Sequence, residues 1–352
     1  MNQTGKILVF RFSAFGDVAM TIPVLASFLA AHPRAEVVFV SRPFAAALLA
    51  PFPQVQFVSF DARGRHKGLL GLWRLFRTLR KMGPFSSVID LHQVLRTRIL
   101  SFFFRLSGRP VFTLDKGRAE KKELVRKNNK LLRPLPSMFE RYREVFVRAG
   151  FDFSLEPFDG RLHYFKEPLP LPHAAFALEG KRIGVAPFAG HHWKTWPFEK
   201  VELLVQELAA RGYQVFLFGG RGREQEELET LASGKERVHN LAGSLSLQQE
   251  LLAMSLLHVM VAMDSANMHL ARLVAAPVVS IWGATHPWAG FYGYDLPGDW
   301  AVQSDLDCRP CSVFGNKVCH RGDFACMQQI SATVVLKKIE KVIGSPMAPA
   351  KL

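Results

Sequence analysis

Residues 263–287 (MDSANMHLARLVAAPVVSIWGATHP) constrain the fold of this chain more than any other segment. A short apolar run ends at Asp264, small and polar residues open a helical pattern, and a second apolar run ends in the small residues of 283–287. The pattern predicts a strand, a turn, a helix, a second strand and a second turn. Doubly wound α/β proteins bind ligands at turns that follow adjacent parallel strands. Asp264 and Ser265 also suit a helix N-terminus, which attracts phosphate, so a nucleotide or nucleotide-linked sugar is the expected ligand.

The same alternation of short apolar runs and helical patterns continues through both halves of the chain. Strands are expected at residues 6–12, 37–40, 55–60, 87–91 and 111–114, and again at residues 182–187, 214–218, 238–240, 257–263 and 277–282. Strands that alternate with helices predict mostly parallel sheets with right-handed crossovers. We therefore expect an α/β protein with one domain over residues 1–165, a second over 166–329, and a C-terminal helix and tail over 330–352.

The excess of positive charge is confined to the first half. Of the net charge of +15, residues 1–165 carry 27 Lys+Arg against 12 Asp+Glu, and the rest of the chain carries 18 of each. Nucleic acid, anionic lipid and a phosphorylated substrate are all compatible with this split. The helical pattern at residues 69–82 is compatible with a membrane surface but is more typical of a helix packed on a sheet. The basic tract at 116–133 interrupts the strand–helix rhythm and is the preferred interaction segment.

The chain has neither a signal-peptide pattern nor an apolar run of the roughly 20 residues that span a bilayer, so we expect a soluble, cytoplasmic protein. Its four cysteines, Cys308, Cys311, Cys319 and Cys326, lie close together in the sequence. In the cytoplasm such clustering favours a metal site or reduced thiols over disulfides. Only the first pair has C-x2-C spacing, so a structural metal remains open. A catalytic metal is not expected, because no Asp/His cluster nearby offers an open site.

Three expected strand-to-helix turns carry side chains suited to sugar or phosphate chemistry. Asp17 follows the first strand, where it serves either as a general base for a substrate hydroxyl or as a helix cap. Lys194 lies in the turn at residues 187–197 and can place its ammonium group against a diphosphate. Glu224 follows a Gly-rich turn, where it either reaches ribose hydroxyls or complements the helix dipole.

The ordered set of these motifs resembles the heptosyltransferases of lipopolysaccharide core synthesis, glycosyltransferase family 9. The motifs are residues 13–18 (SAFGDV), residues 194–197 (KTWP), Asp264-Ser265 with His269, and residues 283–287 (GATHP). The late cysteine segment is similar to that of the heptosyltransferase II-like branch of the family. The resemblance covers nearly the whole chain, with the motifs in order and at suitable spacing.

The resemblance implies a GT-B fold, in which two Rossmann-like domains face a central cleft. The first domain would bind the acceptor and the second the nucleotide sugar. It further implies an inverting transfer that needs no metal or other cofactor, with ADP-heptose as the favoured donor. The acceptor would be the anionic lipopolysaccharide core on lipid A at the inner leaflet, which a basic first domain would attract. The protein would then be cytoplasmic or peripheral at the inner membrane.

The same resemblance assigns roles to individual residues. Asp17 would deprotonate the acceptor hydroxyl, and Lys194 would neutralise the diphosphate leaving group. The expected donor-binding residues are Thr195, Glu224, Asp264, Ser265, Ala266, His269 and Gly283. The family has glycine where this chain has Ala266, which would conflict with a turn that needs a positive φ.

Two alternatives remain from the sequence. The first is a member of the same family that uses another nucleotide sugar. The second is a basic protein that binds nucleic acid or a membrane and retains a nucleotide-binding domain. Aromatic residues do not interleave with the basic tract as single-strand binding requires, so no nucleic acid partner is expected.

Overall fold

The computed structural model describes residues 5–345, and the chain divides into two compact units. Unit 1 contains the chain up to residue 116 together with residues 138–158, and unit 2 contains residues 117–137 and the chain from residue 159 onward. All of the basic tract except Lys116 therefore belongs to the second unit, whereas the predicted boundary at residue 165 assigns the tract to the first domain. The end of the predicted C-terminal tail, residues 346–352, lies outside the described residues.

Unit 1 is built on a five-stranded parallel sheet. Its strands are β1 (Lys6–Phe10), β2 (Glu36–Ser41), β3 (Val55–Ser59), β4 (Phe85–Asp90) and β5 (Val111–Thr113). The strand order is β3-β2-β1-β4-β5, so the chain reverses direction across the sheet between β1 and β4. In open α/β sheets the crevice at such a reversal is where ligands bind.

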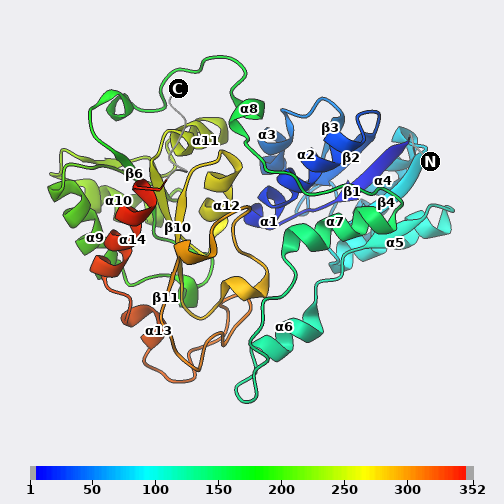
Figure 1. The fold of residues 1–352 in the computed structure, drawn as a ribbon. Helices are drawn as coiled ribbons and strands as arrows, with labels where there is room; N and C mark the ends of the chain where they lie inside the picture. The colour runs from blue at the N-terminus through cyan, green and yellow to red at the C-terminus, as the bar shows by residue number, and fades with distance from the viewer. Residues whose placement is uncertain (1–4, 346–352) are drawn as a thin grey trace. The chain divides into compact units, whose positions relative to one another are not determined.

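Helices cover both faces of the unit 1 sheet (Figure 1). They are α1 (Phe15–Ala19), α2 (Thr21–Ala31), η1 (Pro43–Ala45), α3 (Ala46–Leu49), α4 (Gly68–Met82), α5 (Leu95–Leu106) and α7 (Met138–Arg148). The inner side chains of α4 and α5 join Leu8 and Phe10 of β1 in one core. Helix α2 packs against α7, where Phe28 contacts the rings of Phe146 and Phe151.

Unit 2 repeats the design with a six-stranded parallel sheet. Its strands are β6 (Arg182–Ala186), β7 (Gln214–Leu217), β8 (Val238–Asn240), β9 (Val259–Met263), β10 (Val278–Trp282) and β11 (Ala301–Gln303). The order β11-β10-β9-β6-β7-β8 reverses between β6 and β9. The predicted α/β class with two mostly parallel sheets is confirmed. Strand β11 has only three residues and was not predicted.

The unit 2 helices also enclose its sheet. They are α6 (Arg118–Leu124), α8 (Arg161–Tyr164), η2 (Ala174–Ala177), η3 (His192–Lys194), α9 (Phe198–Ala210), α10 (Arg223–Ala232), α11 (Leu247–Ser255), α12 (Ala266–Leu273), η4 (Pro287–Ala289), η5 (Gly298–Trp300), α13 (Ala325–Gln328) and α14 (Ala332–Ile343). Helix α14 packs against α9 and against the strands β9, β10 and β11. Across residues 5–345, no helix has the length and apolar character needed to cross a bilayer.

The basic tract is partly integrated into unit 2. Lys121 is buried over the ring of Phe291 at 4.3 Å, and Lys130 donates a hydrogen bond to the carbonyl of Asp307 at 2.8 Å. These two cations therefore stabilise the packing of the unit, which weakens the prediction that the whole tract is an interaction segment.

Candidate active site

Three loops of unit 2 meet after the carboxyl ends of the neighbouring strands β6, β9 and β10. Lys194 Nζ lies 2.7 Å from Asp264 Oδ2, and the hydroxyl of Thr285 donates to the same oxygen at 2.8 Å. Asp264 and Thr285 are buried, and the Lys194 side chain is 15% exposed. The structure therefore brings together Lys194 and Asp264, which were predicted from distant motifs. Thr285 was not assigned a role, although it lies in the GATHP segment that carried the resemblance.

Local packing holds Lys194 in this position. The lysine side chain passes over Gly315. Glycine is favoured at this position because its φ is +70° and because a Cβ atom there would collide with the carbons of the Lys194 side chain. The amide of Ala284 donates to the carbonyl of Trp193 at 3.3 Å, which ties the loop after β10 to the loop that carries the lysine.

Helix α12 begins directly beside this cluster. Ser265 is its N-cap in an extended conformation, and the Ser265 hydroxyl does not cap the helix. The Oγ atom is buried and has no hydrogen-bond partner within the described chain. Ala266 is the first helical residue and is not among the residues with positive φ, so the conflict expected from its replacement of glycine does not arise. His269 lies one turn further along α12 and is buried.

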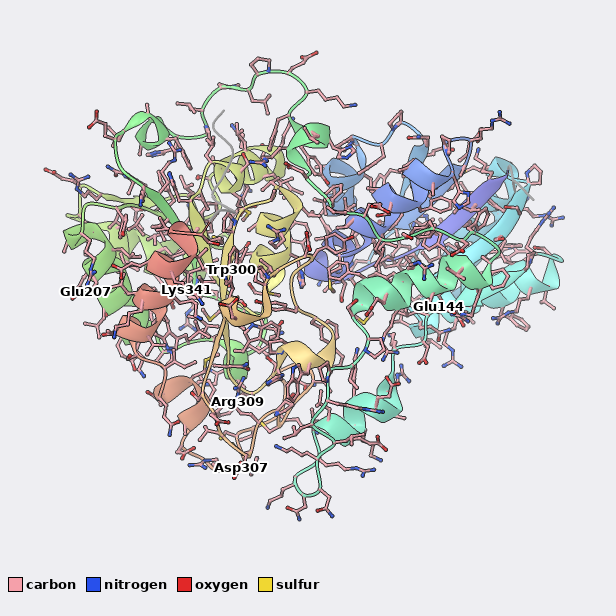
Figure 2. All side chains as sticks on the ribbon, in the orientation of Figure 1. Glu144, Glu207, Trp300, Asp307, Arg309 and Lys341 are labelled. Atoms are coloured by element: carbon pink, nitrogen blue, oxygen red, sulfur yellow. The ribbon has the colours of Figure 1, made fainter. Side chains whose placement is uncertain are left out.

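Arg309 fixes the loop after β10, and sequence reasoning did not identify it (Figure 2). Its buried guanidinium donates to the carbonyls of Trp282, Gly283, Thr285 and Ser304 at 2.5–3.0 Å. Gly283 also packs closely against Met327: a Cβ atom at position 283 would lie only 2.7 Å from Met327 Cγ. The loop that presents Thr285 is therefore rigidly held from two sides.

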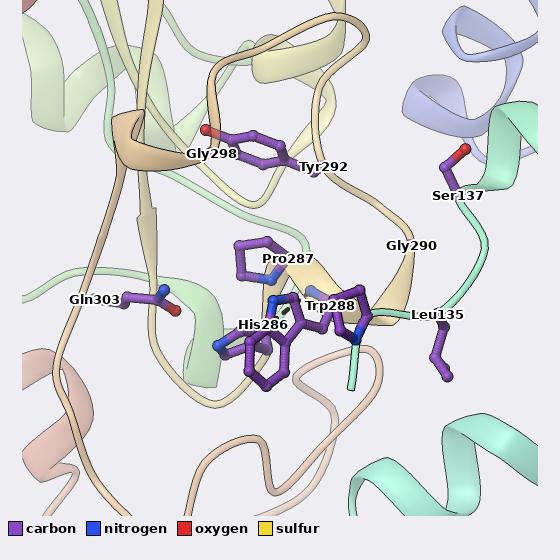
Figure 3. A pocket seen from close by; sticks show the side chains of 10 residues that line it. Leu135, Ser137, His286, Pro287, Trp288, Gly290, Tyr292, Gly298 and Gln303 are labelled. Atoms are coloured by element: carbon purple, nitrogen blue, oxygen red, sulfur yellow. Dashed lines mark hydrogen bonds between the residues drawn. The ribbon is translucent and has the colours of Figure 1, made fainter. Parts of the chain in front are cut away.

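A cavity lies beside this loop (Figure 3). It has a volume of about 230 Å³ and is lined by the rings of His286, Trp288 and Tyr292 together with Gln303 and Leu135. A second hollow of about 300 Å³ shares His286, Trp288 and Gln303 with it. Burial lowers the pKa of His286 to about 4, so this ring is neutral at physiological pH. The cavity offers aromatic and neutral polar surface next to the charged cluster.

In unit 1, Asp17 lies in the first turn of α1, after the central strand β1. Its Oδ2 accepts from the amide of Ala14 at 3.1 Å and lies 2.5 Å from Arg11 Nη2. Arg11 is itself buried and donates to the carbonyl of Leu91 at 2.7 Å. Asp17 therefore caps the helix and is oriented by a fixed cation, while its side chain remains 26% exposed.

His92 follows β4, the strand next to β1, and sequence reasoning did not identify it. Burial, followed by the positive charges of Arg11 and Lys116, lowers the pKa of His92 to about 3. The imidazole is therefore neutral at physiological pH. The segment DLH at the end of an apolar run was the available signal.

The remaining predicted donor-site residues have structural partners of their own. The Thr195 hydroxyl donates to the carbonyl of His191 at 3.4 Å. The Glu224 carboxylate accepts from the amide of Gly220 at 2.7 Å and so stabilises the Gly-rich turn after β7. Their roles toward a nucleotide sugar stay predictions.

The four cysteines are free thiols. Burial raises the pKa of Cys326 to about 12 and also raises the pKa of Cys311. Between residues 5 and 345, no group of three or more His, Cys, Asp or Glu side chains is arranged to hold a metal ion. The metal site that the cysteine spacing left open has no geometric support.

Two parallel sheets with Rossmann-type strand order define a protein of the GT-B class. Residues 72–312 match the family model for glycosyltransferase family 9 (heptosyltransferase). The chain belongs to this family, and it is a glycosyltransferase.

Individual relatives agree with this assignment. The chain is 28% identical to lipopolysaccharide heptosyltransferase 1 of Pseudomonas aeruginosa, over 87% of this chain and 86% of that protein. It is 26% identical to lipopolysaccharide heptosyltransferase 2 of Salmonella typhimurium, over 80% and 84%. The structure of the E. coli heptosyltransferase WaaC with ADP has the same fold, with a TM-score of 0.68, 19% identity and coverage of 96% and 99%. The similarity to both types 1 and 2 leaves the branch within the family a prediction.

Proposed function

We propose that this protein transfers heptose from ADP-heptose to the inner core of lipopolysaccharide. Membership of the family and the names of the relatives from Pseudomonas aeruginosa and Salmonella typhimurium support this substrate pair. The ADP in the WaaC structure supports the adenine nucleotide. The observation that carries the proposal is the cluster of Lys194, Asp264 and Thr285 after three adjacent parallel strands.

On the donor side, the diphosphate binds at this cluster. Lys194 supplies a positive charge, and the unpartnered hydroxyl of Ser265 with the first amides of α12 supplies hydrogen-bond donors. Asp264 orients the lysine through its 2.7 Å ion pair. We assign His269, Thr195, Glu224, Ala266 and Gly283 to the same donor site.

On the acceptor side, Asp17 acts as the general base. Its carboxylate accepts the proton of the acceptor hydroxyl while the hydroxyl oxygen forms a bond to the anomeric carbon. The bond from that carbon to the β-phosphate oxygen breaks on the opposite side, and ADP leaves. A single displacement of this kind inverts the anomeric configuration.

This division of labour needs no metal, because Lys194 and the helix N-terminus stabilise the charge of the leaving diphosphate. Arg11 orients the Asp17 carboxylate. Burial and, after it, the positive charge of Arg11 lower the pKa of His92, so the His92 ring is neutral. Asp17 belongs to unit 1 and Lys194 to unit 2, so the proposed reaction requires both units.

A donor panel tests the proposal. The melting temperature is measured with ADP-heptose, ADP, GDP-sugars and UDP-sugars, and transfer is measured to lipopolysaccharide acceptors truncated before the first heptose residue or directly after it. Stabilisation by ADP-heptose and ADP, with heptose transfer, is expected. Stabilisation by UDP-sugars and not by ADP-heptose would show that the donor is another nucleotide sugar.

A further inference from the structure

Helices α4 and α5 lie side by side in unit 1 (Figure 1). Both helices carry apolar side chains that are exposed. We call this region the α4–α5 surface. Its exposed apolar residues are Leu69, Leu70, Trp73, Leu95, Phe102 and Leu106. An isolated exposed leucine needs no explanation, but apolar side chains gathered on two adjacent helices do.

The spacing on α5 shows that the helix has a second apolar stripe. Leu95, Phe102 and Leu106 are seven and four residues apart, which places them on one side of a helix, and they are 72%, 54% and 72% exposed. Leu100 and Phe104 are buried on the other side, in the core of unit 1. One stripe therefore holds the helix on its sheet, and the other is presented to the surroundings.

Aromatic contacts join the exposed residues of the two helices. The ring of Trp73 on α4 lies 5.2 Å from that of Phe103 on α5, and Phe103 lies 6.2 Å from Phe102. Trp73 and Phe102 are both exposed, so the apolar surface continues from one helix to the other.

The charge of this region is almost entirely positive. Residues 62–114 contain eleven lysines and arginines and a single acidic residue, Asp90, whose side chain is completely buried. Arg74 and Arg77 on α4, and Arg98 and Arg105 on α5, are exposed on the same helices as the apolar residues. Helices α4 and α5 therefore combine exposed apolar side chains with cations, and neither helix contains an acidic residue.

We propose that the α4–α5 surface binds the anionic headgroups of a phospholipid bilayer, with both helices in the plane of the interface. Amphipathic helices bind membranes through this combination of buried apolar side chains and cations that attract acidic lipids. Arginine stems also cover apolar surface while their guanidinium groups remain at the headgroups. A nucleic acid would use the cations but leave Leu95 and Leu106 exposed to water. The proposal does not depend on the donor or the acceptor of the enzyme.

Vesicle co-sedimentation of the full chain tests the proposal. The protein is mixed with vesicles of phosphatidylethanolamine and phosphatidylglycerol, or with vesicles of phosphatidylcholine alone. We expect binding at least about tenfold stronger to the anionic vesicles at low salt, because several cations act together. Added salt should weaken the electrostatic contribution to binding, whereas the contribution of the apolar side chains should remain.

Two double variants separate the contributions. Phe102→Ser/Leu106→Ser removes apolar area, and Arg98→Gln/Arg105→Gln removes charge; each is expected to lower the partition coefficient by about tenfold or more. Leu162→Ser/Leu203→Ser is the apolar control, because both residues are exposed on unit 2. Lys181→Gln/Lys337→Gln is the charge control, with the same change in net charge. The controls should bind as the unaltered protein does.

Other results would overturn the proposal. Equal binding to neutral and anionic vesicles, or equal loss in test and control variants, would exclude a specific anionic-lipid surface. The protein could instead fail to bind vesicles and form a dimer. If Phe102→Ser/Leu106→Ser dissociates that dimer, a second copy of the chain covers the α4–α5 surface. Binding of an oligonucleotide, with no vesicle binding, would identify a nucleic-acid surface instead.

Discussion

Lys194 and Asp264 form a largely buried ion pair, 2.7 Å long, between the loops that follow the neighbouring strands β6 and β9. Thr285 donates to the same carboxylate oxygen, so Asp264 fixes the lysine and the third loop at once. The lysine is thereby oriented before any ligand binds, which lowers the reorganisation required when negative charge develops on a leaving diphosphate.

Replacement of this lysine should therefore impair both binding and chemistry. Lys194→Ala is expected to lower kcat for heptose transfer by about 100-fold and to weaken ADP binding, because it removes the cation that pairs with Asp264. Steady-state kinetics and calorimetric titration with ADP measure the two effects. Lys181→Ala, which alters an exposed lysine before β6, should change neither; an active Lys194→Ala enzyme would contradict the proposed role.

The Ser265 hydroxyl is a second test of the donor site. Its buried oxygen has no partner within residues 5–345, so Ser265→Ala should leave the melting temperature of the free protein unchanged or slightly higher. The same variant should weaken ADP binding by about tenfold, because a hydrogen bond to a charged phosphate is lost. Ser255→Ala is the control, since that hydroxyl is bonded to the carbonyl of Leu252. Unchanged ADP affinity in Ser265→Ala would remove this residue from the site.

Arg309 should contribute to stability more than an exposed arginine does. Arg309→Leu leaves four carbonyl groups without their donor and is expected to lower the free energy of unfolding by about 3 kcal/mol or more. Urea denaturation measures this change. Arg321→Leu breaks only the exposed pair with Asp323 and should barely move the midpoint. Similar midpoints for the two variants would show that the loop after β10 does not depend on Arg309.

Glu250, in the first turn of α11, gives a prediction for pH dependence. Burial raises the pKa of Glu250 to about 7, so the folded protein holds a proton that the unfolded chain, with a pKa of 4.5, releases. The free energy of unfolding that depends on this group is therefore highest below pH 4.5. It falls as the pH rises from 4.5 through 7 and then stays at its lower value. Glu250→Gln should therefore raise the free energy of unfolding by up to about 3 kcal/mol at pH 8 and leave it unchanged at pH 4.5.

Denaturant melts at the two pH values check this sign. Glu202→Gln, on the exposed face of α9, is the matched control and should have no effect at either pH. An equal gain for Glu250→Gln at pH 4.5 and pH 8 would indicate an effect of packing instead of ionisation.

The sheets were predictable because their strands are apolar runs that end at distinctive residues. Strand β9 ends next to Asp264 and β10 next to Gly283, and both strands are fully buried. Strand β11 was not predicted; only one of its three residues, Val302, is buried, and Gln303 is exposed. The segment after β1 folds as two helices, α1 and α2, which meet at Met20.

The parts that sequence reasoning missed depend on contacts between distant segments. Arg309 binds carbonyls that precede it by up to 27 residues, and no local pattern distinguishes such an arginine. Charge counts likewise do not show exposure: Lys121 of the basic tract is buried, whereas the arginines of α4 and α5 are exposed. We therefore place the proposed membrane surface on these helices, whose apolar residues and arginines are exposed together.

The central claim is that Asp17 is the base for heptose transfer, and the kcat of Asp17→Asn tests it most directly. General base catalysis contributes 10²- to 10⁴-fold, so kcat from ADP-heptose to the truncated lipopolysaccharide acceptor should fall by about 1,000-fold, with ADP affinity unchanged. Asp61→Asn, which alters an exposed aspartate of the same unit, serves as the control. A folded Asp17→Asn enzyme that keeps kcat within about threefold of the unaltered protein would contradict the claim.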